Sequence, residues 1–377
     1  MATILQLVPA LESGGVERGT VEIAAALAAA GHRSLVMSGG GRMVPDLERA
    51  GSEHFVWPIG QKSLRALGLV RPLRRFFQEQ AVDVVDVRSR MPAWVVWWAW
   101  SGLPHHQRPR LVTSVHGFNS VNRYSEILTR GERVVAVSES LRSFLLQHYP
   151  KLDPDRVTVI HRGVDSDYYH PKFHPSSVWY AEWREAFPQL AGKFVLTLPG
   201  RITRLKGHHD ALEVLRRLLD RGVPAHLLLV GGTDPRKQGY RRELAQRIKA
   251  LALSGDVTFA GQRSDLREIL AASDVVLSLS EKPESFGRTT LEALSLGRPV
   301  LGYDHGGVGE QLTALMPGGR VPPGHIDEAV EHLARWFTEG PPVPHWPNPW
   351  TLAAMCERTL ELYEQTASQG GGLARSG

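Results

Sequence analysis

Cysteine is nearly absent from this sequence of 377 residues, in which Cys356 is the single example. One thiol excludes an intrachain disulfide and a zinc site made of cysteines, and it fits a reducing compartment, so we predict a cytoplasmic protein. Long apolar runs are absent as well. The longest, at 93–100, has eight residues, whereas a membrane-spanning helix needs roughly 20. We interpret this tryptophan-rich run as a mostly buried helix, with contact to an acceptor or a membrane as the alternative.

Two common signals are missing from the amino-terminal region. Residues 1–3 lead directly into an apolar stretch at 4–8 without the basic region of a signal peptide, so we expect none. The glycine-containing turn that follows, 9–17, lacks the G-x-G-x-x-G spacing of dinucleotide-binding folds. An NAD-linked enzyme is therefore a weak interpretation.

Acidic clusters with metal-binding spacing are also scarce. The D-x-D pattern occurs at 153–155 and 165–167, which lie away from the phosphate-favouring segments described below. Asp83 and Asp86 border an apolar strand, and we interpret them as solvated residues at strand ends. We therefore predict that the protein requires no metal ion.

What the sequence does contain is the composition of an ordinary globular protein. Hydrophobic residues make up 42% of the chain and charged residues 22%. A chain of 377 residues exceeds the size at which single hydrophobic cores stop growing, about 250–300 residues. We therefore expect two domains, each with its own core.

Strand and helix signals alternate along the chain, which predicts an α/β fold with parallel sheets and crossover helices. In the first half a helix signal lies at about 15–30, and strand signals lie at 4–8, 34–38, 82–87, 111–115, 134–137 and 157–160. The alternation breaks at 166–192 and resumes from Phe194 to about Phe337. We predict a first domain over 1–170, a second domain over 171–349 that opens with a linker at 171–192, a returning helix over 350–367 and a disordered tail over 368–377.

A segment with two carboxylates, Glu284 and Glu292, is where we expect the chemistry. An apolar strand at 275–279 precedes it and residues 286–296 have helical spacing, so Glu284 falls on a loop and Glu292 inside a helix. A helix amino terminus after a glycine-containing loop offers N–H groups and a positive dipole end, which favour phosphate or sugar oxygens. For an isolated pair, a capping carboxylate and a solvated one would be the plainer interpretation.

Three further segments of the second half favour the functional interpretation. Arg201 and Lys206, in G-R-I-T-R-L-K-G at 200–207, fall at the carboxyl end of an apolar strand, where open α/β sheets bind ligands. Two fixed cations there would neutralise a diphosphate. The same half contains F-A-G-Q-R at 259–263 and G-G-V-G-E at 306–310.

In this order the segments resemble the motifs of family 4 of the retaining, nucleotide-sugar-dependent glycosyltransferases, which read G-R-x4-K-G, F-x-G, E-x7-E and G-G-x2-E. The resemblance covers nearly the whole chain, because the first half carries the family's glycine pair, Gly14 and Gly15, and a strand-ending histidine, His116. Many relatives have asparagine at the position of Arg162, and we interpret this departure as a tolerated change. The family implies the GT-B architecture, two Rossmann-like domains facing each other across a cleft.

The resemblance also implies roles for individual residues. Arg201 and Lys206 would stabilise the charge that builds on the leaving diphosphate. Glu284 would bind a hydroxyl of the transferred sugar, and His116 would contact the same sugar. Glu292 would accept hydrogen bonds from both ribose hydroxyls. The other donor-binding positions that the family implies are Gly14, Gly15, Arg263, Ser285, Phe286, Gly287, Arg288 and Thr289.

The activity that the resemblance implies is hexose transfer from a nucleotide diphosphate sugar to a saccharide or lipid-linked saccharide, in the synthesis of cell-surface glycan or lipopolysaccharide. UDP-hexose is the favoured donor, and we expect no cofactor beyond this nucleotide-sugar cosubstrate. Two alternatives stay open. One is a nucleotide-sugar 2-epimerase of the same architecture, and the other is a non-catalytic module that binds glycan or lipid.

Positive charge is concentrated at residues 61–80. This segment contains five basic residues and one acidic residue, Glu79, so its net charge is +4, whereas the net charge of the whole chain is +5. The basic residues are Lys62, Arg65, Arg71, Arg74 and Arg75. Leucine and phenylalanine alternate with these cations, as on a basic amphipathic helix at an anionic lipid surface. We predict peripheral membrane contact here, with a surface helix packed on the first domain as the alternative. Nucleic acid is not expected as a partner, because no other basic stripe is present.

Overall fold

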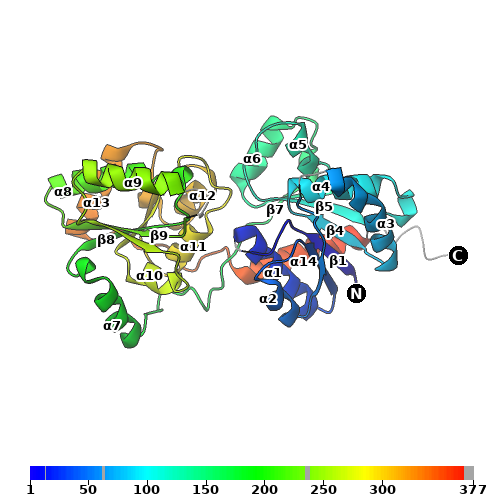
Figure 1. Ribbon diagram of the computed structural model, residues 1–377, viewed down its shortest axis with the longest axis horizontal. Coiled ribbons are helices and arrows are strands. Elements are labelled where there is room, and N and C mark those ends of the chain that lie inside the picture. Colours follow the sequence, from blue (N-terminus) through cyan, green and yellow to red (C-terminus); the bar gives the residue numbers. More distant parts are fainter. Residues whose placement is uncertain (13, 62–63, 234–237, 369–377) are drawn as a thin grey trace. The chain divides into compact units, whose positions relative to one another are not determined.

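The computed structural model of the protein describes residues 1–12, 14–61, 64–233 and 238–368, with only the backbone of residues 64 and 65. The chain divides into two compact units. Unit 1 consists of Met1–Gly163 and Leu352–Gly377, and unit 2 consists of Val164–Thr351. Each unit is a parallel sheet with helices on both faces, so the predicted α/β class with two Rossmann-like parts is confirmed (Figure 1).

Unit 1 contains, within the described residues, a seven-stranded parallel sheet in the order β3-β2-β1-β4-β5-β6-β7. Its strands are β1 Thr3–Leu7, β2 Arg33–Ser38, β3 Glu53–Val56, β4 Val84–Val87, β5 Arg110–Val115, β6 Arg133–Ala136 and β7 Val157–Val159. One face carries α1 Gly15–Ala29, α2 Val44–Arg49 and α14 Leu352–Ser368 (Figure 1). The other carries α3 Val70–Glu79, α4 Arg90–Ser101, α5 Arg123–Glu126 and α6 Glu139–His148.

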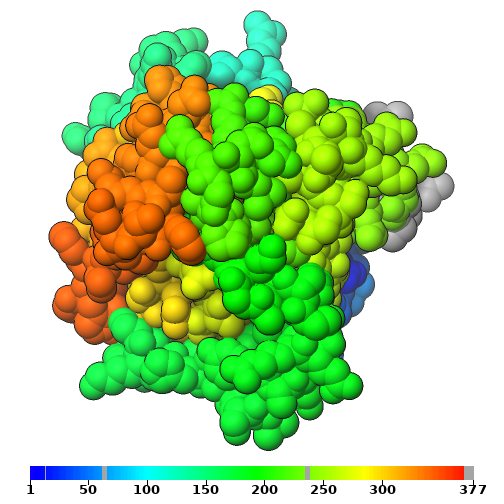
Figure 2. All heavy atoms as spheres, turned by 90° about the vertical axis from the view of Figure 1, so that its left-hand side faces the viewer, coloured from blue at the N-terminus to red at the C-terminus, as the bar shows by residue number. Residues whose placement is uncertain are grey.

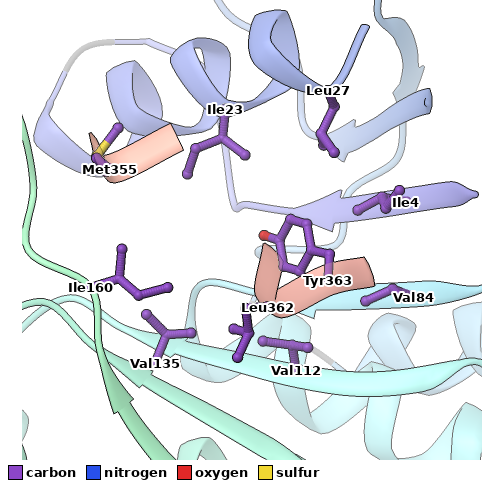
Figure 3. Packing of buried hydrophobic residues seen from close by; sticks show 10 residues of the cluster. All are labelled: Ile4, Ile23, Leu27, Val84, Val112, Val135, Ile160, Met355, Leu362 and Tyr363. Carbon is purple, nitrogen blue, oxygen red and sulfur yellow. The ribbon is translucent and has the colours of Figure 1, made fainter. Parts of the chain in front are cut away.

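The core of unit 1 lies between the sheet and helices α1 and α14 (Figure 3). Strand residues such as Ile4 and Val112 face Ile23 of α1 and Leu362 of α14. Full burial of one large aliphatic side chain contributes about 1.5–3 kcal/mol. Helix α14 is therefore an integral part of unit 1, although the whole of unit 2 separates it from the other elements along the chain.

A polar network also crosses this core. Asp86 is fully buried in β4, and its carboxylate accepts hydrogen bonds from Arg88, from the Ser114 hydroxyl and from the Tyr363 hydroxyl. Arg88 also donates to the hydroxyl of Thr20 in α1. The prediction that Asp86 is a solvated strand end is wrong, because this network supplies the partners that a buried carboxylate needs. Breaking one member of such a network leaves a buried charge uncompensated.

The basic segment at 61–80 packs on unit 1 through its apolar residues. Leu73, Phe76 and Phe77 of α3 are buried, and Phe76 makes an edge contact with Phe55 of β3. Arg74 donates hydrogen bonds to two carbonyl oxygens of α4. The apolar face is therefore used inside the protein, which corresponds to the packed surface helix that was the alternative. Lys62 lies outside the described residues, as does the side chain of Arg65.

The tryptophan-rich run forms α4, and its four indole rings are half-buried. Trp97 and Trp100 stack with ring centroids 5.4 Å apart. The Arg130 guanidinium lies 5.2 Å from the Trp97 ring centroid, and that of Arg108 lies 4.6 Å from the Trp100 centroid. Cation–π contacts of this kind stabilise the half-buried rings.

Unit 2 contains, in its described part, a six-stranded parallel sheet in the order β10-β9-β8-β11-β12-β13. Its strands are β8 Phe194–Pro199, β9 Ala225–Val230, β10 Val257–Gly261, β11 Val275–Ser278, β12 Val300–Tyr303 and β13 Arg320–Val321. Its helices are α7 Ser177–Ala186, α8 His208–Asp220, α9 Gln238–Ala250, α10 Leu266–Ala272, α11 Arg288–Ser295, α12 Gly306–Leu315 and α13 Ile326–Glu339. Helices α8 and α13 pack side by side, as Figure 2 shows in green and orange.

The boundary between the units falls earlier than the sequence predicts. Residues 164–170 belong to unit 2, where Val164 pairs with Thr351. The Arg267 guanidinium of unit 2 lies 3.8 Å from the Tyr168 ring centroid. These contacts fix the segment to unit 2, so the predicted limit after residue 170 is corrected to Gly163.

Residues 171–192 are not a plain linker, because they include α7. Trp179 and Trp183 of this helix stack with ring centroids 5.0 Å apart and pack on the buried cluster around Val195. Residues four apart in sequence lie on one face of a helix, so the two indoles form an apolar face that binds the sheet. The returning helix, predicted at 350–367, is α14. Residues 369–377 of the predicted tail lie outside the described residues.

One strand was not predicted, although the other strands of unit 1 lie within two residues of their predicted positions. The missing strand is β3, at the edge of the sheet, where its four residues are half-buried or exposed. Such an edge strand lacks the apolar run that marks the central strands. Within the described residues, no helix is long and apolar enough to cross a bilayer.

Candidate active site

Strands β8 and β11 are neighbours at the centre of the unit 2 sheet, where the order of connection reverses. From β8 the chain continues outward to β9, whereas from β11 it continues in the opposite direction to β12. Open α/β sheets bind ligands at such a switch point, outside the carboxyl ends of the strands. Both loops here carry predicted site residues: the loop after β8 holds Arg201 and Lys206, and the loop after β11 holds Glu284.

The two loops meet in an ion pair. Lys206, in the short 3-10 helix Arg204–Lys206, donates a hydrogen bond of 2.7 Å from Nζ to Oε1 of Glu284, and both side chains are about a quarter exposed. The hydroxyl of buried Ser280 donates to the same carboxylate oxygen. Burial alone would raise the pKa of Glu284, but the positive charge and hydrogen bond of Lys206 outweigh it and hold that pKa below its usual value. Glu284 is therefore an ionised acceptor at neutral pH.

Glycines allow these loops to approach one another. Gly207 has φ 68°, and a Cβ atom there would lie 1.8 Å from the carbonyl oxygen of Leu279. Gly306 has φ 59°, and a Cβ atom on it would lie 2.5 Å from the carbonyl oxygen of Glu284. Only glycine suits such positions. The glycines of K-G and of G-G-x2-E thus bring backbone directly against the loops that carry Leu279 and Glu284.

Helix α11 begins beside this ion pair. Its first residues are Arg288, Thr289 and Thr290, and its amino-terminal N–H groups have no partner within the helix. A cavity of about 10 Å³, room for a single water molecule, is lined by Lys206 and Glu284 together with Thr289 and Thr290. The structure thus places a cation, a carboxylate and a helix amino terminus around one point.

Glu292 lies one turn into α11 and is buried, with 4% of its side chain exposed. Its carboxylate lies 3.5 Å from Nε of Arg288, four residues earlier. Glu292 is therefore not the solvated helical glutamate of the plainer interpretation, because a buried carboxylate requires charged or hydrogen-bonding partners.

Three other predicted residues of unit 2 take no part in the ion pair. Arg201 is exposed on the loop after β8. Arg263 forms a two-pronged pair with Asp265, with bonds of 2.8 and 2.7 Å, so its guanidinium is already engaged. The ring of Phe286 is buried against Trp350, and the Phe286 carbonyl oxygen accepts a hydrogen bond from the Gln311 side chain.

Three predicted residues belong to unit 1. Gly14 is the residue before α1 and Gly15 is the first residue of that helix, directly after the loop that follows β1. His116 directly follows β5. The guanidinium of Arg162, a residue that sequence reasoning set aside, donates to the carbonyl oxygen of Gly15 at 2.5 Å and to Nδ1 of His116 at 3.0 Å. Burial, and then the charges of Arg162 and Arg88, lower the pKa of His116 well below its usual value.

Sequence reasoning missed two further residues around Glu284. Ser280 lies two residues after β11, and its hydroxyl donates to the Glu284 carboxylate. The second residue is His305, whose Nε2 lies 2.8 Å from the backbone carbonyl oxygen of Ser280. A hydroxyl four residues before a loop carboxylate was the available signal for Ser280. Among residues 1–12, 14–61, 64–233 and 238–368, no group of three or more His, Cys, Asp and Glu side chains is arranged to hold a metal ion.

Comparisons with known proteins find a matching family model for each half of the chain. Residues 13–168 match the family model described as Glycosyltransferase Family 4, and residues 180–346 match that of Glycosyl transferases group 1. D-inositol 3-phosphate glycosyltransferase of Rhodococcus erythropolis is 30% identical over 190 residues, which are 49% of this chain and 41% of that protein. The chain thus spans about half the length, or less, of the first curated relatives that it matches.

Solved structures extend the similarity to the whole chain. A glycosyltransferase of Rickettsia africae superposes with a TM-score of 0.81 at 27% identity, over 100% of this chain and 99% of that one. HepE of Anabaena, solved in complex with UDP, superposes with a TM-score of 0.75 at 24% identity, over 97% and 98% of the two chains, and shows the shared fold. Because family models match both halves and a solved glycosyltransferase superposes over the whole chain, the chain belongs to family 4 of the glycosyltransferases and has the GT-B fold.

Proposed function

We propose that this protein transfers a hexose from a nucleoside diphosphate sugar, with a UDP-sugar as favoured donor, to a hydroxyl of a saccharide or lipid-linked saccharide. The anomeric configuration of the sugar is retained. The observation that carries the proposal is the ion pair of Lys206 and Glu284 beside the amino terminus of α11, at a switch point of the sheet. A cation and N–H groups at a helix amino terminus suit a diphosphate, and an ionised carboxylate suits a sugar hydroxyl.

In the proposed reaction, the bond between C1 of the sugar and a β-phosphate oxygen breaks, and its electron pair goes to that oxygen. The acceptor oxygen bonds to C1 on the same face, and its proton passes to the departing phosphate. Negative charge therefore grows on the diphosphate. Lys206, Arg201 and the N–H groups of α11 would stabilise that charge, which lowers the barrier because it is greatest in the transition state.

The two glutamates would have different tasks. Glu284 is ionised, so it can only accept hydrogen bonds, and we assign it a hydroxyl of the transferred sugar. Glu292 would accept from both ribose hydroxyls, a geometry that one carboxylate provides well. His116, Gly14 and Gly15 would contact the sugar and the diphosphate. Fixed cations supply the positive charge in this scheme, so a required metal ion is not part of the proposal.

Incubation with labelled nucleotide sugars tests the reaction and separates the alternatives. UDP-glucose is the first donor to try, because HepE of Anabaena was solved with it. The acceptor panel should combine saccharides with phosphorylated polyols, because the Rhodococcus relative is named for inositol 3-phosphate. Transfer with retained configuration, seen by proton NMR, supports the proposal. An inverted product contradicts it, epimerised donor indicates the 2-epimerase, and binding without turnover indicates the non-catalytic module.

Contact with an anionic membrane through residues 61–80 would be electrostatic. The apolar residues Leu73, Phe76 and Phe77 are buried in unit 1, whereas Arg71 and Arg75 of α3 are exposed. Each exposed cation near an anionic leaflet contributes about 1 kcal/mol, so such contact would be weak and sensitive to salt. Synthesis of lipid-linked or cell-surface glycan is the setting in which it would be useful.

A further inference from the structure

Arg162 joins two loops of unit 1 that are far apart in sequence. It lies just after β7, is 7% exposed, and uses two nitrogens of its guanidinium, one for the Gly15 carbonyl oxygen and one for Nδ1 of His116. Gly15 follows β1 and His116 follows β5. One side chain therefore fixes the position of a glycine and a histidine that the family motifs single out.

The direction of these hydrogen bonds determines the state of the imidazole. A guanidinium has donors only, so Nδ1 of His116 must accept and cannot carry a proton. The positive charges of Arg162 and Arg88 disfavour a second charge on the ring, which is consistent with a lowered pKa. His116 is then a neutral imidazole with its proton on Nε2.

Helix α1 is built to accommodate this arginine. A Cβ atom on Gly19, inside α1, would lie only 2.1 Å from a terminal nitrogen of Arg162. Glycine in a helix interior costs about 0.5–1 kcal/mol relative to alanine. The absence of a side chain at Gly19 therefore leaves space for the guanidinium in its present position.

We propose that Arg162 is a positioning residue that holds His116 in the Nε2–H tautomer and holds the carbonyl of Gly15, so that the imidazole is available as a hydrogen-bond donor and not as a general base. The proposal rests on the proposed glycosyl transfer for its catalytic consequence. Its structural part, the tautomer, does not depend on that function. It also reverses the interpretation of Arg162 as a tolerated change.

Nitrogen NMR of the ring tests the tautomer directly. Protein labelled with ¹⁵N-histidine gives two ring nitrogens for His116, which are assigned by their loss in His116→Gln. We expect Nδ1 at the shift of an unprotonated nitrogen and Nε2 at that of a protonated one. A protonated Nδ1 in the wild-type protein would overturn the proposal, whether or not the protein transfers sugar.

A substitution tests the positioning role. In Arg162→Asn, which places the family's common residue here, the ring nitrogens should shift toward averaged values, and kcat should fall about 10- to 100-fold, as for other losses of position. Arg133→Asn is the matched control, because the Arg133 side chain donates only to the surface carbonyl of Asp155, and it should leave both readouts unchanged. An unchanged tautomer and unchanged kcat in folded Arg162→Asn would contradict the positioning role. If the wild-type protein also shows no turnover of the donor, the proposed function fails. The NMR shifts alone then decide whether Arg162 positions His116.

Discussion

The Nζ atom of Lys206 lies 2.7 Å from Oε1 of Glu284, although 78 residues separate them in the sequence. They meet because β8 and β11 are adjacent in the sheet, so the loops that follow these strands emerge together. Neither charge is fully solvated, and removal of one partner of a desolvated pair is costly for the other. The pair is therefore a fixed arrangement of opposite charges at the carboxyl ends of β8 and β11.

Replacement of Lys206 by alanine should remove transition-state stabilisation of about 3 kcal/mol, a loss of kcat of roughly 100-fold or more, because a fixed cation no longer faces the leaving diphosphate. Arg201→Ala should have an effect in the same direction. Arg204→Ala is the matched control, because Arg204 lies in the same 3-10 turn but pairs with Glu243 at the surface. Steady-state kinetics measure all three, and equal rates for Lys206→Ala and Arg204→Ala would contradict the assigned role.

The two glutamates should separate in kinetics. Glu292→Ala should weaken donor binding, because the carboxylate that we assign to ribose is lost. Glu284→Ala should mainly lower kcat, because the lost contact is to the reacting sugar. Donor titrations and initial rates give the two quantities. If both variants had the donor affinity and the rates of the wild type, the assigned roles of Glu284 and Glu292 would be contradicted.

Stability should depend on pH through buried His208. Burial lowers the pKa of this histidine to about 4, whereas the unfolded chain protonates near 6.5. Between these values only the unfolded state binds the proton, so the free energy of unfolding falls as pH decreases from about 6.5 toward 4, by up to about 3 kcal/mol. Urea denaturation at several pH values measures the loss, which His208→Phe should reduce. His325→Phe, at an exposed position, is the control and should retain the wild-type dependence of unfolding free energy on pH. If His208→Phe lost as much unfolding free energy between pH 6.5 and 4 as the wild type, the assignment to His208 would be contradicted.

Membrane contact, if electrostatic, should vanish at high salt. Sedimentation with vesicles of anionic lipid should recover part of the protein at low salt and none at high salt, because surface charges are screened beyond roughly 8–10 Å at physiological ionic strength. Arg71→Ser with Arg75→Ser should abolish recovery, whereas Arg49→Ser, on another exposed arginine of unit 1, should not. Equal recovery in the supernatant under every condition would eliminate this contact.

Part of the candidate site could be predicted because Lys206 and Glu284 lie on loops that follow strands. Apolar runs identify β8 and β11, and residues placed just after parallel strands meet at one edge of the sheet, so Lys206 and Glu284 could be expected near each other. The same reasoning failed for β3, which is short and lies at the edge. It also failed for α7, because the apolar face of this helix is recognised only from its packing on the sheet.

Residues that act through distant partners could not be recognised from the sequence. Arg162 contacts residues 46 and 147 positions away, and Asp86 accepts from Tyr363, 277 positions away. A charged residue with no visible partner is ordinarily assigned to solvent, and this rule gave the wrong interpretation of Asp86. For α3 the sequence left two interpretations open, because alternating cations and apolar residues suit a membrane surface and a domain surface equally, and the structure shows its apolar residues packed on the domain.

Calorimetric titration with UDP, GDP and ADP, and with the corresponding nucleosides, tests most directly whether unit 2 binds a nucleotide sugar at Lys206. We predict that the wild type binds one of the diphosphates, with UDP favoured. We also predict that Lys206→Ala weakens that binding about 10- to 100-fold and leaves nucleoside binding unchanged, since a charge-assisted hydrogen bond contributes about 1.5–3 kcal/mol. Absence of binding by all three diphosphates, or equal affinity in the wild type and Lys206→Ala, would contradict the proposed site.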